Sequence, residues 1–158
     1  MAKNKSPLVF LDANVLIEAA IVQSPPVVAI MHLAATGVLT LITCKLVIDD
    51  VEDEILERAA INPGETDDLI KNWHRLLERT ELKIIGNPPI NLVLDTKKKY
   101  LALMRHLADI LVLAVAIEVK ADSILSGNRK HFNDKTSRKC GIPIYSCQEF
   151  LRQFIISS

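Results

Sequence analysis

The sequence has no net charge and no closely paired cysteines. Nineteen Lys and Arg residues are balanced by nineteen Asp and Glu residues over 158 positions. A chain without net charge does not hold nucleic acid through its overall field, so such a contact would need a local basic patch. Its three cysteines, Cys44, Cys140 and Cys147, include no Cys-x-x-Cys pair. This excludes a zinc knuckle or a dithiol redox motif and predicts three reduced thiols in a cytoplasmic protein.

Signals for secretion or for a membrane span are also missing. The polar leader over residues 1–6 has no apolar segment behind it that ends in a small-residue cleavage site, which argues against secretion. No charged residue occurs from Ala19 to Cys44, but two prolines and Gly37 interrupt this run. We therefore expect two buried helices and a strand there and no membrane span. With 49% apolar residues, the chain suits one domain over residues 1–158.

Several catalytic motifs do not occur. No Gly-x-Gly-x-x-Gly follows the first apolar run, which disfavours a dinucleotide site, and there is no phosphate-binding loop of an NTPase. The Gly-x-Ser-x-Gly elbow of α/β-hydrolases is absent too. A phosphatase with an aspartyl nucleophile at Asp12 would normally carry a second Asp two residues later, where this chain has Asn14. These absences leave the acidic residues as the main candidates for chemistry.

The sequence does contain an alternation of short apolar runs with longer segments of helical periodicity. The short runs predict buried strands. Strands that are nearly free of polar residues indicate a parallel sheet covered on both faces, so we expect an α/β fold: a three-layer α/β/α sandwich with strand order 3-2-1-4-5. The expected strands are 8–11, 38–43, 82–85, 123–126 and 142–146, and the expected helices are 13–23, 26–36, 45–60, 65–80, 90–106, 108–121 and 147–154.

Acidic residues lie where this fold would bind a ligand. Open α/β sheets bind ligands beyond the carboxyl ends of the strands, where the strand order reverses, and Asp12 follows the first strand. Asp109 is the only acid between Asp95 and Glu118, and five acids crowd residues 49–54. Three carboxylates in one crevice would repel one another unless a cation lay between them, and oxygen ligands suit Mg²⁺ or Mn²⁺. The residue types thus indicate metal-assisted phosphodiester cleavage. Alternatively, Asp12 and Asp109 simply begin their helices.

Three segments of the chain carry distinctive arrangements of polar residues beside strands and helices. VFLDANVLIEA has an apolar strand, then Asp, then Asn before a helix. In TCKLVIDDVEDEILERA, a Thr precedes a helix rich in acids. DILVLAVAIEVKADSILSGNRKHF runs from Asp through an apolar helix and a strand to Ser, Gly, Asn and a final Phe. Together, and in this order, they resemble the PIN domain (PilT N-terminus-like or VapC-like), a ribonuclease family that includes many prokaryotic toxins of toxin–antitoxin pairs.

The resemblance implies roles for individual residues. Asp12 matches the first metal-binding acid of the family and Asp109 the third. Asp50 fits the second best, with Glu54 as the second choice. Asn128 stands where the family commonly has a fourth Asp, and because an amide oxygen carries no negative charge, the implied site has three carboxylates. The small polar residues that match supporting positions are Asn14 and Ser126.

The resemblance also implies a function and partners. The implied function is a metal-dependent endoribonuclease that hydrolyses RNA phosphodiesters with metal-activated water, as a toxin with an antitoxin protein as its partner. The alternative is a catalytically weakened PIN module that binds RNA or a protein partner, which Asn128 favours. Homodimers are frequent in the family, and residues 26–36 would suit one, although core packing explains this segment equally well.

Two basic segments are candidates for contacting RNA. Arg129, Lys130 and His131 follow Asn128 directly and would either hold a phosphate backbone beside the crevice or form a plain surface turn. Residues 96–106 carry three consecutive lysines near Tyr100, which would stack on a base. A solvated helix surface explains these lysines at least as well.

Overall fold

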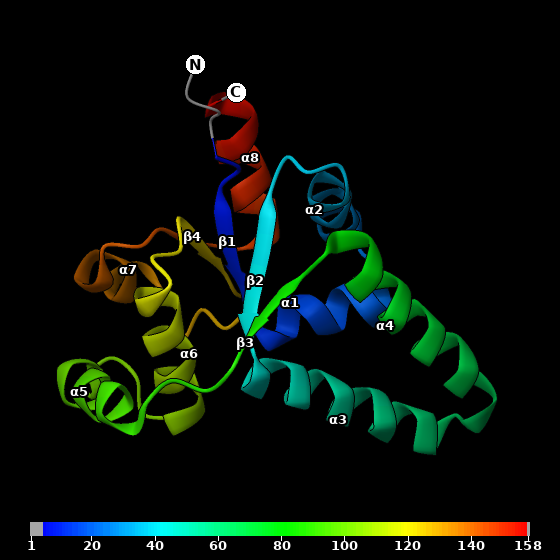
Figure 1. Ribbon diagram of the computed structural model, residues 1–158, viewed down its shortest axis with the longest axis horizontal. Helices are drawn as coiled ribbons and strands as arrows, with labels where there is room; N and C mark the ends of the chain where they lie inside the picture. Colours follow the sequence, from blue (N-terminus) through cyan, green and yellow to red (C-terminus); the bar gives the residue numbers. More distant parts are fainter. Residues whose placement is uncertain (1–4, 158) are drawn as a thin grey trace.

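The computed structural model describes residues 5–157, so residues 1–4 of the expected polar leader lie outside it. Its centre is a sheet of five strands in the order β3-β2-β1-β4-β5, surrounded by helices (Figure 1). All neighbouring strands run parallel. The predicted α/β sandwich and its strand order are therefore confirmed. The strands are β1 (Leu8–Leu11), β2 (Thr40–Cys44), β3 (Lys83–Ile85), β4 (Ser123–Leu125) and β5 (Ile144–Tyr145).

Helices supply the connections that parallel strands require, because each crossover must return along the sheet. α5 packs against α6, whereas α2 packs against α4 and α8. The α-helices are α1 (Ala13–Ile17), α2 (Pro25–Ala35), α3 (Lys45–Ile61), α4 (Thr66–Thr80), α5 (Ile90–Tyr100), α6 (Leu107–Glu118), α7 (Asp134–Cys140) and α8 (Cys147–Ser157). Two short helices of other types are the π-helix η1 (Glu18–Val22) and the 3₁₀-helix η2 (Pro63–Glu65).

Strand β1 is the centre of both the sheet and the hydrophobic core. Val9 lies opposite Leu41 of β2 on one side and opposite Ser123 of β4 on the other. Val9, Phe10 and Leu11 are fully buried, as expected for a strand covered on both faces. The order of strand addition reverses at β1, so the carboxyl ends of β1 and β4 lie side by side at the position where such sheets bind ligands.

Three of the expected helices end at least three residues early, including the one expected over 108–121, which ends at Glu118. The helix expected over 13–23 is α-helical only to Ile17 and continues as η1, which ends at Gln23 in the left-handed conformation (φ 54°). The helix expected over 90–106 ends at Tyr100, whose ring is buried. There the ammonium of Lys139 donates to the carbonyl of Lys99, which satisfies one of the free carbonyls at the end of α5.

The α-helix α7 and the 3₁₀-helix η2 were not predicted, and strands β2 and β5 begin later than expected. The Asn133 side chain accepts hydrogen bonds from the main-chain N–H groups of Lys135 (3.1 Å) and Thr136 (3.2 Å), and Gly141 ends α7 in the left-handed conformation. These are ordinary start and stop signals that the sequence does carry. β2 and β5 each begin two residues later than expected, and Pro143, which has no N–H, lies outside β5.

Within residues 5–157, the three cysteines are free thiols. Over the same range, no single helix is both long enough and apolar enough to cross a membrane; the segments Ala13–Val22 and Pro25–Ala35 meet those criteria only together, as a pair bent by 99°.

Candidate active site

Asp12 joins the end of β1 to the start of α1 and has two roles. Its Oδ1 accepts a hydrogen bond from the N–H of Ala13 (2.8 Å), so it is the N-cap of α1. Its Oδ2 accepts one from the hydroxyl of Ser126 (2.7 Å), just beyond β4. The side chain is almost completely buried, with 6% of the residue exposed. The two readings of Asp12 left open by the sequence are therefore compatible, because the capping residue also faces the neighbouring strand end.

The turn after β4 is tied to the start of α1 by the two small polar residues that the sequence singled out. Besides its bond to Asp12, the Oγ of the fully buried Ser126 accepts the N–H of Asn128 (3.0 Å). The Oδ1 of Asn14 accepts the N–H of Gly127 (2.7 Å), and its amide lies 3.4 Å from Asp12 Oδ2. A Cβ on Gly127 would come within 3.2 Å of Asn14 Oδ1, so the close approach suits glycine. Asn14 and Ser126 thus orient both the carboxylate and the turn.

Asp109, in the first turn of α6, is held by a partner that sequence analysis did not assign to it. Its Oδ2 lies 2.5 Å from Nδ1 of His131. Because an ionised carboxylate carries no proton, the imidazole Nδ1–H must donate in this contact. His131 is itself buried, and its ring lies 5.1 Å from that of His106. The structure thus places His131 against Asp109, a candidate metal ligand.

Asp50 lies on α3, and its pKa is raised by causes that include the charge of Asp109. Burial raises the pKa of Asp50, and the neighbouring acids Asp53 and Asp49 and then Asp109 raise it further. Glu54, the second choice, instead forms an ion pair with Arg58 (3.1 Å). The other acids of this helix that have partners are Asp49, paired with Lys45, and Glu52, which accepts from the indole of Trp73. The effect of Asp109, on α6, on the pKa of Asp50 therefore relates the acids of these two helices electrostatically.

The charges of this group fit a divalent cation. Burial raises the pKa of Asp12, the hydrogen bonds from Ser126 and Ala13 lower it, and the Asp109 carboxylate raises it again. Neighbouring negative charges are stabilised by a cation placed among them, and carboxylate oxygens suit Mg²⁺ or Mn²⁺. Within the described residues, however, no three Asp, Glu, His or Cys side chains already converge on a common metal position. The oxygen donors and the negative charge suit a divalent cation, but the described side chains do not form a complete set of metal ligands.

The residues after β4 have different environments. Asn128 is half-buried, and its carbonyl accepts the N–H of Phe132 (2.9 Å). Arg129 lies 3.5 Å from a carboxylate oxygen of Glu149 on α8, so its charge is partly neutralised. Lys130 is exposed and has no ion pair in the part of the chain that the structure describes. Of the three basic residues predicted to contact RNA, Lys130 is the one whose side chain has neither a carboxylate partner nor a buried position.

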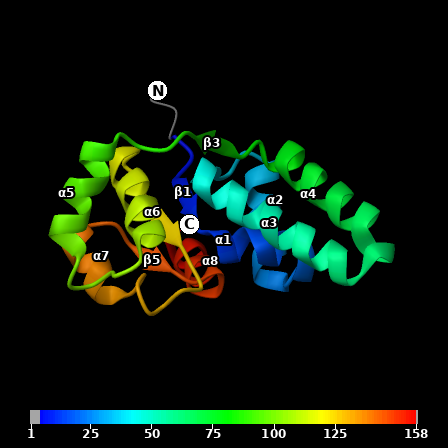
Figure 2. The same ribbon diagram turned by 90° about the horizontal axis from the view of Figure 1, so that it is seen from below.

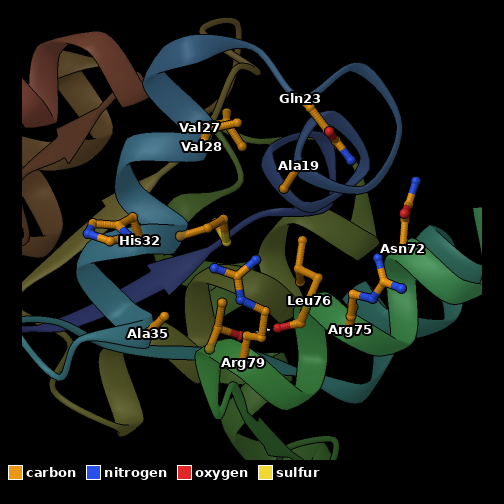
Figure 3. A pocket seen from close by; sticks show the side chains of 12 residues that line it. Ala19, Gln23, Val27, Val28, His32, Ala35, Asn72, Arg75, Leu76 and Arg79 are labelled. Atoms are coloured by element: carbon orange, nitrogen blue, oxygen red, sulfur yellow. Dashed lines mark hydrogen bonds between the residues drawn. The ribbon is translucent and has the colours of Figure 1, made fainter.

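One cavity adjoins the candidate site, and another lies between two helices at a distance from it in the fold. One of about 280 Å³ adjoins the site and is lined by Asn14, Gly127 and Cys147 among others. The other, of about 340 Å³, lies between α2 and α4, with Val27, Arg75 and Arg79 among its lining residues (Figure 3). Neither cavity is lined by Asp12, Asp50 or Asp109.

Comparison with known families matches residues 8–130 to the PIN domain. The chain belongs to the PIN domain family. The match extends from β1 to just beyond the Asn128 turn, so it includes every acid of the candidate site. The predicted family is therefore confirmed. No curated protein gives a significant sequence match.

Solved PIN-like structures share the fold at low sequence identity. VapBC2 from Rickettsia felis, bound to a DNA fragment from its promoter, matches with a TM-score of 0.67 and 15% identity over 88% of this chain and 98% of the other. PAE2754 from Pyrobaculum aerophilum matches with a TM-score of 0.68 and 14% identity over 96% and 91%. FitAcB from Neisseria gonorrhoeae matches with a TM-score of 0.66 and 13% identity over 89% and 98%. At these identities, the likeness supports the fold.

The first prediction concerns the cost of keeping Asp12 charged when no metal is bound. In EDTA at pH 7, we expect Asp12→Asn to raise the midpoint of thermal unfolding. Because the folded-state pKa of Asp12 is raised above its ordinary value of 3.8, its contribution to stability is present below that value and is lost as the pH rises through the raised pKa. An uncharged amide avoids this loss. Thermal denaturation followed by circular dichroism over a range of pH values measures the difference.

The advantage of Asp12→Asn should vanish towards the ordinary carboxyl pKa, because the wild-type carboxyl is then protonated too. Asp49→Asn is the matched control, since Asp49 is exposed and paired with Lys45 on the surface of α3. A variant that is less stable than the wild type at pH 7 would show that the hydrogen bonds to Asp12 outweigh its desolvation.

The second prediction concerns His131 as the residue that orients Asp109. His131→Phe keeps the ring but removes Nδ1, so we expect Mn²⁺ affinity to fall by about ten- to a hundredfold, as when the partner of a metal-ligating side chain is removed. His131→Asn retains an N–H near the Nδ1 position and should recover part of the affinity. Titration calorimetry with Mn²⁺ measures both. Equal affinities in His131→Phe and the wild type would exclude the orienting role.

Proposed function

We propose that this PIN domain protein is a metal-dependent endoribonuclease that hydrolyses RNA phosphodiesters with water and forms no covalent enzyme intermediate. The observation that carries the proposal is the position of the buried Asp12 directly after β1, where Asp109 on α6 raises its pKa and also that of Asp50 on α3. The carboxyl end of a central parallel strand, where Asp12 lies, is the usual position of an active site in open α/β sheets. Membership of the family supports the same reading.

The residues that would hold Mg²⁺ or Mn²⁺ are Asp12, Asp50 and Asp109, with the Asn128 amide oxygen as a neutral fourth ligand. Glu54 is less favoured, because it is paired with Arg58. A divalent cation supplies charge that activates water and offsets the negative charge of the phosphodiester in the transition state. Ser126 and Asn14 keep the Asp12 carboxylate in one orientation through bonds to Oδ2, and His131 does the same for Asp109. These contacts place the ligand oxygens before metal or substrate binds.

We further propose a cytoplasmic toxin of one domain that acts with an antitoxin protein. The resemblance to toxins of toxin–antitoxin pairs and the fold likeness to VapBC2 and FitAcB support this reading. A homodimer through residues 26–36 remains part of the proposal, and Val28 in this segment is 48% exposed. The second candidate function is a PIN module that binds RNA without cutting it. The neutral Asn128 and the absence of a closed set of ligands among the described residues favour that candidate.

The third prediction tests the proposed activity directly. Structured and single-stranded RNAs incubated with Mg²⁺ or Mn²⁺ should be cut by the wild type, whereas EDTA should stop cleavage. Asp12→Asn, Asp50→Asn and Asp109→Asn should each lower the rate by roughly two orders of magnitude or more, as when one electrostatic contributor to an active site is removed. Asp49→Asn is the matched control on the same helix as Asp50.

Two outcomes would decide between the candidates. Cleavage that survives EDTA or Asp12→Asn comes from a contaminating nuclease and refutes the assignment. An uncut panel of RNAs that the protein nevertheless binds would favour the non-catalytic module.

The fourth prediction concerns the position where the family commonly has Asp. Asn128→Asp adds a negative charge to a turn that is bonded through Ser126 to Asp12, so we expect several-fold tighter Mn²⁺ binding. Asn133→Asp adds the same charge at the start of α7, where Asp also caps a helix, and serves as the control. Calorimetric titrations that are unchanged in Asn128→Asp would place this side chain outside the metal site.

A further inference from the structure

The absence of net charge conceals a strong separation of charge along the chain. Residues 45–85 contain six Lys and Arg against eleven Asp and Glu, a net charge of −5. Residues 86–140 contain ten Lys and Arg against five Asp and Glu, a net charge of +5. The first segment comprises α3, η2, α4 and β3, and the second comprises α5, α6, β4 and α7.

The fold carries this separation into space. Figures 1 and 2 show α3 and α4 towards one end of the long axis and α5, α6 and α7 towards the other, in two perpendicular views. The molecule is therefore polarised, with an acidic end and a basic end. Over distances within about a Debye length, which is roughly 10 Å at 0.1 M salt, such a polyampholyte presents a field of one sign at each end in spite of its zero net charge.

Cations at the basic end are gathered without counter-ions. None of the six cations on α5 and α7 has an ion pair with a carboxylate in the described structure, although the two helices carry Asp95 and Asp134. At the acidic end, by contrast, Lys45 and Arg58 are paired with acids of α3. We call these six residues the basic surface: Lys97, Lys98, Lys99, Lys135, Arg138 and Lys139.

Two helices that are distant in sequence meet at this surface. The Lys139 ammonium donates to the carbonyl of Lys99, and the ammonium groups of Lys139 and Lys99 lie 5.1 Å and 5.9 Å from the centre of the Tyr100 ring. The fold thus brings ammonium groups from α5 and α7 to the same aromatic ring, and a bound polyanion would offset their repulsion. Tyr100 is only 2% exposed, so its ring supports the lysines and does not stack on a base as the sequence analysis considered.

The candidate active site lies at the boundary between the two ends. Asp50 comes from α3 of the acidic segment, Asp109 from α6 of the basic segment, and Asp12 from the central strand. A polyanion attracted by the basic end would reach these acids from that side and would be repelled by the acidic end beyond them.

We propose that the RNA substrate places its phosphate backbone on the basic surface of α5 and α7, so that the strand approaches the acids only from this end. This inference rests on the proposed ribonuclease function and adds the substrate's path. Contacts of this kind are between lysine or arginine and phosphate, so they give affinity and orientation without sequence preference.

The test compares two pairs of charge-neutralising substitutions. Lys98→Gln with Lys135→Gln removes two exposed cations from the basic surface. Lys71→Gln with Lys83→Gln removes two exposed cations, also without ion pairs in the described structure, from the acidic segment and is the matched control. Neither pair includes a residue of the site, and Lys139 is left in place because it ends α5. Binding of a fluorescent single-stranded RNA of about 20 nucleotides is followed by anisotropy in EDTA at several salt concentrations.

We expect the basic-surface pair to weaken RNA binding several-fold. The slope of log affinity against log salt should become shallower by about 0.7 for each phosphate that a lysine no longer neutralises, or about 1.4 for two. The control pair should leave both quantities at their wild-type values. With Mg²⁺ or Mn²⁺ present, the basic-surface pair should raise KM and leave kcat unchanged, because these lysines would bind the substrate equally in ground and transition states.

The outcomes separate this inference from the function on which it rests. If the wild type cleaves RNA but the two pairs behave alike, the path over α5 and α7 is overturned while the ribonuclease assignment stands. If the wild type neither binds nor cleaves RNA, both are overturned. A basic-surface pair that lowers kcat at unchanged KM would also refute the path, because the lysines would then act on the site and not on the approach of the substrate.

Discussion

The buried carboxylate of Asp12 is the constraint on which the candidate site depends. Val9, Phe10 and Leu11 of β1 are fully buried, and Asp12, the next residue, is only 6% exposed. The hydrogen bonds from Ser126 and Ala13 compensate part of the desolvation of the charge, yet burial still raises the pKa of Asp12. A buried carboxylate whose pKa is raised by desolvation and by the charge of Asp109 is a candidate for a functional group as well as a helix cap.

Hydrogen bonds from residues after β4 hold two of the candidate metal ligands in place. Ser126 connects Asp12 to the turn after β4, and Asn14 holds the N–H of Gly127 from the other side. His131 fixes Asp109 from a turn that follows the same strand. Carboxylates from β1 and α6 are therefore both positioned by residues just beyond β4, while Asp50 comes from a separate helix. Asp12 and Asp109 would therefore be in position before a metal ion binds, whereas Asp50 is exposed.

Local and periodic patterns account for what could be predicted from the sequence. Apolar runs such as Leu8–Leu11 identify the strands, and the convergence of strand ends in a parallel sheet brings Asp12, Asn14 and Ser126 together without any knowledge of side-chain contacts. The contact of Asp109 with His131 joins residues 22 positions apart and has no periodic signal. Which acid of residues 49–54 faces the site depends on the rotation of α3 about its axis. The sequence does not show this rotation, because acids occupy five of these six positions. The contact of Lys139 with the Tyr100 ring requires α7, which Asn133 and Gly141 delimit but which has no apolar periodicity.

The central claim is that Asp12 and Asp109, with Asp50, hold a divalent cation at the end of β1. The most direct measurement is an anomalous difference map from crystals of the wild-type protein grown or soaked with Mn²⁺. The account predicts a peak at bonding distance, about 2.0–2.2 Å, from carboxylate oxygens of Asp12 and Asp109. A map at saturating Mn²⁺ with no peak between these carboxylates, or with its peaks only at other acids of the surface, would contradict it.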